Sequence, residues 1–160
     1  MRPLRFSFLA LLPVIVLSSA LAPARPAAIT FQFQYAAKVI CSAEVTRSPL
    51  TPQTYATSIN INNPSDSLIV FFRKRPVITF PPGFQVPQRP LKPLNDSLPP
   101  SWALTTDCLD LRRRLGLTQP FFEGFVVIQS TLPLDVISVF TVPGGIDVVP
   151  VAERRVSIGQ

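Results

Sequence analysis

Residues 121–142 constrain the fold most, because they predict two consecutive β-strands. The first strand, 121–129, contains Phe125-Val126-Val127-Ile128, a run that is apolar on both faces, as expected for a strand in the middle of a packed sandwich. The second strand, 134–142, is rich in β-branched and aromatic residues, which suit a pleated surface. Residues 130–133 join the two, so we expect a hairpin, and its only charges are Glu123 and Asp135.

Strict alternation predicts further strands on both sides of a proline-rich segment. Apolar residues occupy every odd position of 29–41, which indicates a long strand with one solvated face. Residues 54–63 alternate in the same way. An apolar run predicts a strand over 67–73, interrupted at Arg73-Lys74-Arg75 and extended briefly over 77–80. Residues 146–151 predict a last strand, and 152–160 a frayed tail.

The segment 81–100 holds seven prolines, each without a backbone donor, so no central strand can run through it. We expect an extended crossing from one sheet to the other. A disordered linker between two domains is the alternative, but the flanking pieces are each too small to fold alone. Residues 108–115 predict a short helix, with Asp107 as its N-cap, Asp110 in the first turn and Gly116 at its end.

Seven or eight short strands, one short helix and no alternation of strands with helices indicate a mainly β protein. We expect a single antiparallel two-layer β-sandwich over 29–151. It is not a standard antibody-type domain, because Trp102 lies only six residues before Cys108.

The first 22 residues predict a cleaved export signal. Arg2 and Arg5 precede an apolar run over 6–17, and cleavage after Ala20, Ala22 or Ala24 fits the small residues there. A membrane anchor is the alternative, but the run falls short of the roughly 20 residues needed to span a bilayer. The protein is therefore expected to be secreted or periplasmic, without a transmembrane span once the signal is removed.

Export bears on both the cysteines and the charge. Cys41 and Cys108 are expected to form a disulfide in an oxidising compartment; the alternative is a reactive thiol at Cys108, near three arginines. The 15 Lys and Arg residues and 9 Asp and Glu residues give a net charge of +6. Loss of Arg2 and Arg5 lowers it to +4, a mild excess that favours anionic surfaces but not a specific nucleic acid.

Several phrases resemble a set of small exported bacterial proteins without an assigned activity: Tyr35-Ala-Ala-Lys-Val-Ile-Cys41, Thr54-Tyr-Ala-Thr-Ser-Ile-Asn-Ile-Asn-Asn-Pro64, Asp107-Cys108, Gly124-Phe-Val-Val-Ile-Gln-Ser130 and Leu134-Asp-Val136. The resemblance implies a single exported immunoglobulin-like β-sandwich. It implies no catalytic residue, because no activity comes with it.

The residue types exclude several chemistries. The chain has no His and two Cys, so Ser-His-Asp sites, Cys-His sites and zinc sites are excluded. No nucleophile elbow, phosphate-binding glycine loop or calcium loop is present. Asp107 and Asp110 could form a carboxylate pair that hydrolyses sugars, but the first turn of a helix explains them better. We expect no catalytic residue, no metal and no cofactor.

Three clusters could bind a partner. Arg73-Lys74-Arg75 could bind an anion, although an edge strand protected by charge is the structural interpretation. Arg112-Arg113-Arg114 could bind phosphate or lipid headgroups, although a solvated helix end also explains them. Tyr55 and Trp102 could stack on a sugar or peptide, although inward aromatic residues usually belong to the core.

The sequence therefore predicts an exported, non-enzymatic binding or structural accessory at the bacterial envelope. It would act through a strand edge or the basic clusters, on an envelope protein or an anionic surface. The alternative is a small carbohydrate-binding or carbohydrate-active protein that uses Trp102 and nearby carboxylates. A third hypothesis, binding to an anionic polymer or a membrane surface, predicts affinity that falls steeply with salt.

Overall fold

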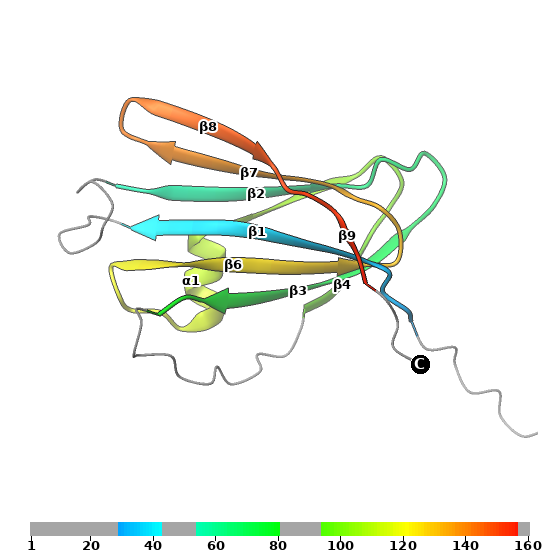
Figure 1. The fold of residues 1–160 in the computed structure, drawn as a ribbon, viewed down its shortest axis with the longest axis horizontal. Helices are drawn as coiled ribbons and strands as arrows, with labels where there is room; N and C mark the ends of the chain where they lie inside the picture. Colours follow the sequence, from blue (N-terminus) through cyan, green and yellow to red (C-terminus); the bar gives the residue numbers. More distant parts are fainter. Residues whose placement is uncertain (1–28, 43–53, 81–93, 157–160) are drawn as a thin grey trace, which may run out of the picture.

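The part of the chain that the structure describes is a sandwich of two antiparallel β-sheets with one short helix (Figure 1). The computed structural model describes residues 29–42, 54–80 and 94–156. In chain order the elements are β1 (Phe33–Ser42), β2 (Ala56–Asn62), β3 (Val70–Ile78), β4 (Leu94–Leu98), β5 (Ala103–Asp107), α1 (Cys108–Leu115), β6 (Phe121–Ser130), β7 (Asp135–Val142), β8 (Gly145–Pro150) and β9 (Arg154–Arg155). One sheet has the strand order β4-β3-β6-β1-β9 and the other β5-β2-β7-β8. The mainly β, two-layer prediction is confirmed.

Strand β1 shows how the alternating pattern builds the core. Phe33, Tyr35, Ala37, Val39 and Cys41 are all buried, whereas the intervening residues up to Ile40 are at least partly exposed. The strand pairs with β6 along its whole length. It begins at Phe33 rather than at residue 29. Apolar residues from both sheets fill the space between them: Tyr35, Val39, Ile59, Ile61, Val70, Phe72, Phe122, Val126, Ile128 and Val136.

The predicted hairpin over 121–142 is wrong, because its two strands belong to different sheets. Strand β6 lies in the centre of the five-stranded sheet, and β7 lies in the four-stranded sheet. Between them the chain crosses the sandwich, where the Leu134 N–H donates to the Tyr35 hydroxyl oxygen at 2.8 Å. Both strands bury one face in the same core, so their apolar patterns fit a crossing as well as a hairpin.

Strand β3 runs without interruption through Arg73-Lys74-Arg75, which corrects the predicted break. It is not an edge strand here, since β4 pairs with it from Val70 to Lys74 and β6 from Phe72 to Ile78. Pro76 is tolerated in β3 because its backbone nitrogen, which carries no N–H, faces away from β6, so no hydrogen bond to β6 is lost. The Thr79 N–H donates to Glu123 in the β6 direction, and backbone groups alternate sides along a strand.

A glycine in the middle of β6 lets β3 approach closely. A Cβ atom on Gly124 would lie 2.1 Å from the carbonyl oxygen of Val77 on β3. No side chain fits at that distance, so the β3–β6 pairing requires glycine at this position.

Strands β4, β5 and β9 form where no strand was expected. Strand β4 lies in the proline-rich segment, at the sheet edge, after which the chain crosses to β5 in the other sheet. The expected crossing between sheets is therefore present, whereas 81–93 lie outside the described residues. The tail prediction is wrong for Arg154 and Arg155, which pair as β9 with Phe33 and Gln34 of β1. The described ranges thus contain nine strands, rather than the seven or eight expected.

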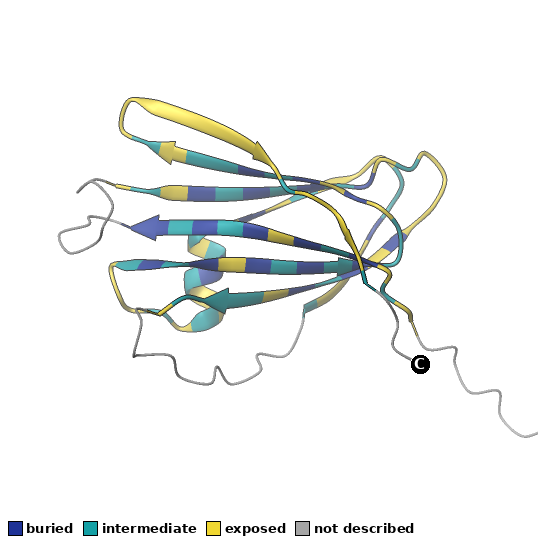
Figure 2. Ribbon diagram, viewed as in Figure 1, coloured by how far each residue is buried: buried dark blue, intermediate teal, exposed yellow. Residues whose placement is uncertain are grey.

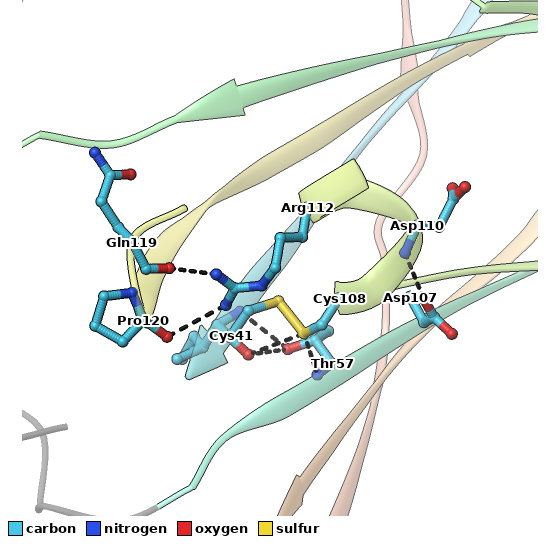
Figure 3. The surroundings of a disulfide bond; sticks show 9 residues. Cys41, Thr57, Asp107, Cys108, Asp110, Arg112, Gln119 and Pro120 are labelled. Atoms are coloured by element: carbon cyan, nitrogen blue, oxygen red, sulfur yellow. Dashed lines mark hydrogen bonds between the residues drawn. A yellow bond between two sulfur atoms is a disulfide. The ribbon is translucent and has the colours of Figure 1, made fainter. Parts of the chain in front are cut away.

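The predicted helix is confirmed with both of its ends. The Asp107 side chain accepts a hydrogen bond from the Asp110 N–H at 2.8 Å, and Gly116 ends the helix with φ 62°. Cys108, its first residue, forms a disulfide with Cys41 at the end of β1 (Figure 3). The predicted disulfide is thus confirmed, and the alternative of a free thiol is wrong.

Candidate functional site

The alternation of β3 splits the predicted cluster Arg73-Lys74-Arg75 between two faces. Arg73 and Arg75 point outward from the five-stranded sheet, and Arg75 is exposed. Lys74 points between the sheets and is only 7 % exposed. The cluster is therefore not one patch: two of its cations are available to a partner and the third is not.

Arg73 is held in place by a row of side chains across three strands. Its Nε donates to Gln129 Oε1 at 2.7 Å, and Gln129 Nε2 donates to Gln34 Oε1 at 3.1 Å. The guanidinium carbon also lies 4.6 Å from the centre of the Phe31 ring. These contacts fix the plane of the guanidinium, so Arg73 loses little conformational entropy when it binds an anion.

The other side of the same face carries Lys38 and Phe125. Lys38 Nζ lies 2.8 Å from Glu123 Oε2 and 5.2 Å from the centre of the Phe125 ring. Arg154 belongs to this face as well, because it pairs with Gln34. We call Lys38, Arg73, Arg75 and Arg154, together with Glu123, Phe31 and Phe125, the basic face. Four cations and one carboxylate give it a net charge of +3.

Lys74, inside the sandwich, has a polar partner, but no carboxylate of the described residues is in direct contact with it. Its Nζ donates to Thr106 Oγ1 at 3.1 Å and lies 5.7 Å from the centre of the Phe72 ring. Burial lowers the pKa of the amine, and the charge of Arg114 lowers it further, whereas Asp96 and Asp110 act in the opposite direction. A buried amine in these surroundings costs stability, so Lys74 is a structural liability within the core.

The second predicted cluster, Arg112-Arg113-Arg114, lies on α1, and two of its members have local roles. Arg112 donates to the carbonyl oxygens of Gln119 and Pro120, the residues that lead into β6 (Figure 3). Arg114 pairs with Asp110 at 2.6 Å on the same helix. Arg113 is exposed, and within the described residues its side chain has neither a carbonyl partner nor an ion pair. This cluster is therefore mainly structural.

Trp102 is 63 % exposed, so the expectation that it belongs to the core is wrong. Its backbone carbonyl accepts from the Asn63 N–H at 2.9 Å, which extends the β2–β5 ladder by one pair. The other stacking candidate, Tyr55, is half-buried and pairs with Ser42 instead. The structure therefore does not join Tyr55 and Trp102 in one stacking surface.

Strand β8 is exposed along its whole length at the edge of its sheet (Figure 2).

No family model, curated protein or solved structure matches this chain. In the ranges that the structure describes, no group of three or more metal-ligating residues comes together, and no helix is long and apolar enough to cross a membrane. The site must therefore be judged on its own chemistry.

Tyr35 provides a test of the pairing between β9 and β1 at the edge of the five-stranded sheet. Its hydroxyl donates to Glu153 Oε2 at 3.0 Å, and burial, together with the Glu153 charge, raises its pKa from 10.0 to about 12. In a Tyr55→Phe variant, which leaves Tyr35 as the only tyrosine, absorbance at 295 nm should report titration near pH 12. Because the pKa of Tyr35 is higher in the folded protein than in the unfolded chain, its contribution to stability is complete below pH 10. This contribution should be lost as pH rises from 10 to 12. Titration near pH 10 in the folded protein would contradict the contact.

Proposed function

We propose that this protein is an exported, non-enzymatic binding module that holds an anionic partner on its basic face. The observation that carries the proposal is the net charge of +3 on one face of the five-stranded sheet, beside the fixed guanidinium of Arg73. A guanidinium with a fixed plane binds carboxylate or phosphate groups through paired hydrogen bonds. Arg75 lies two residues further along β3, about 6.6 Å away along the strand, so both cations can contact one partner.

Export to the bacterial envelope is supported by the disulfide and by the leader pattern. Disulfides persist in oxidising compartments and are rare in the cytosol, and Cys41 and Cys108 are paired. The expected signal peptide over residues 1–22 lies outside the described residues. The envelope also presents many anionic groups, which fits the charge of the basic face.

The immunoglobulin-like type of sandwich is part of the proposal. The order β9-β1-β6-β3 in one sheet and β2-β7-β8 in the other corresponds to the immunoglobulin orders A-B-E-D and C-F-G. Strand β9 would then replace the first strand, and the segment β4-β5-α1 would be an insertion before β6. This correspondence supports the type by its pairing order alone.

Binding to a soluble polyanion tests the proposal directly. Calorimetric titration of the oxidised mature protein with linear polyphosphate should give an affinity that falls as salt rises. The double variant Arg73→Gln/Arg75→Gln should bind roughly 30-fold more weakly, since each cation near an anionic surface contributes about 1 kcal/mol.

The matched control removes the same charge elsewhere. Arg113 and Arg155 are exposed and lie outside the basic face, so Arg113→Gln/Arg155→Gln should lose less than about threefold in affinity. Equal losses in the two double variants would mean that net charge alone drives binding, and the proposed face would then be wrong.

A further inference from the structure

We infer that the anionic partner is a lipid bilayer, which the protein docks with an apolar end of the sandwich next to the basic face. This inference depends on the proposed function, because it names the partner for the same face. The apolar end consists of four exposed large side chains, Leu68, Ile69, Phe71 and Trp102, which we call the apolar apex. They are 54, 52, 45 and 63 % exposed.

A buried asparagine joins the two segments that carry the apex. Asn63 is fully buried, and its Nδ2 lies 2.8 to 3.0 Å from the carbonyl oxygens of Leu68, Leu98 and Pro99. The Ser65 N–H donates to its Oδ1 at 3.0 Å. One side chain thus ties the connection between β2 and β3 to the approach to β5, and both lie at the same end of the sandwich in Figure 1.

The backbone beside Trp102 is held in an uncommon conformation. Ser101 has φ 58°, the only positive φ of a non-glycine residue in the described part of the chain. Its N–H donates to the Ser65 carbonyl at 2.9 Å, and the Trp102 N–H donates to Pro99 at 3.2 Å. Strained backbone of this kind persists only when surrounding contacts enforce it, and it is concentrated at binding sites. Trp102 is therefore presented to solvent on a rigid support.

The apex and the basic face are continuous along β3. Phe71 and Arg73 are two residues apart and point to the same side of the sheet, as does Arg75. Apolar side chains give no favourable contact with a hydrated polyanion, but they can enter the interface of a bilayer. Cations beside them attract anionic headgroups. Since stable membrane anchoring needs two such signals, an anionic bilayer fits both surfaces at once.

The only tryptophan of the chain is in the apex, so its fluorescence reports docking directly. Vesicles of phosphatidylglycerol and phosphatidylcholine should shift the Trp102 emission to the blue, and brominated lipids should quench it. Pure phosphatidylcholine vesicles should do neither. The variant Leu68→Ser/Ile69→Ser should weaken vesicle binding at least about tenfold, through loss of apolar burial, and leave polyphosphate binding unchanged. Both side chains are exposed, so folding should be retained, which circular dichroism checks.

The outcomes of these measurements separate the two proposals. Polyphosphate binding without a shift or quenching of Trp102 on anionic vesicles would overturn the bilayer and leave the proposed function intact. Equal binding to neutral and anionic vesicles would also overturn the inference, because charge would then have no role. If neither polyphosphate nor anionic vesicles bind, both proposals are wrong. Loss of vesicle binding in Arg73→Gln/Arg75→Gln, but not in Arg113→Gln/Arg155→Gln, supports both.

Discussion

Replacing Cys41 and Cys108 by alanine should lower the free energy of unfolding by about 4 kcal/mol. The disulfide closes a chain segment of 67 residues, and in the chain-entropy model a loop of this size contributes roughly that amount. It also joins the end of β1 to the first residue of α1, which follows β5 of the other sheet. Its loss removes a covalent link between the two layers.

Neighbouring contacts add to this effect. The Thr57 hydroxyl donates to the Ile40 carbonyl at 2.8 Å and accepts from the Ile40 N–H at 2.9 Å, and the Thr57 N–H donates to Cys108 Sγ at 3.1 Å (Figure 3). Urea unfolding of the oxidised protein and the double alanine variant measures the difference. Alanine at position 41 avoids burying a hydroxyl group, since Cys41 is fully buried. A difference below about 1 kcal/mol would show that the disulfide is dispensable for stability.

The second large effect is expected to be a gain in the free energy of unfolding. Lys74→Met combined with Thr106→Val should stabilise the protein by about 2 kcal/mol at neutral pH, because it replaces a buried amine and its hydroxyl partner by apolar groups. Lys74→Met alone should gain less, since it leaves the Thr106 hydroxyl unpaired. Arg75→Met, two residues away on the exposed face, should change stability by less than about 0.5 kcal/mol.

The gain should also depend on pH. The pKa of Lys74 is lower in the folded protein than its ordinary value of 10.5. Between the two pKa values the unfolded chain binds more protons at Lys74, so the destabilisation caused by Lys74 should decrease as pH rises to about 10.5. In the double variant this pH dependence should be missing, and the difference between the two proteins should shrink as pH increases. A gain that is constant from pH 7 to 10.5 would contradict the burial of a titrating amine.

Local patterns were enough to predict most elements of the fold. The odd positions of β1 and the signals around α1 act within a few residues, and the structure confirms both. The pairing of β6 and β7 could not be predicted, because an apolar strand pattern does not specify which sheet a strand joins. Strand β9 was missed for a similar reason: Arg154 and Arg155 have no apolar pattern, and their place depends on a free edge of β1.

The candidate site was predicted only in part. Arg73 and Arg75 were named, but Lys38 and Arg154 come from other strands, and only the register with Gln34 and Phe125 brings them to the same face. Period two through residues 73–75 was the signal that could have separated Lys74 from its neighbours. Trp102 follows Ser101, whose positive φ no residue type there indicates, so alternation along the chain could not predict where the Trp102 side chain lies.

The placement of Lys74 decides whether the basic face exists, because that face forms only if β3 continues through Arg73-Lys74-Arg75. Acetylation of the native, oxidised protein at pH 8, followed by peptide mass spectrometry, compares Lys74 with Lys38. Lys74 is buried and bonded to Thr106, whereas Lys38 is partly exposed. We expect Lys74 to react about 100-fold more slowly, since its modification requires local opening. Equal rates at the two lysines would mean that β3 is interrupted there, and the basic face would not exist.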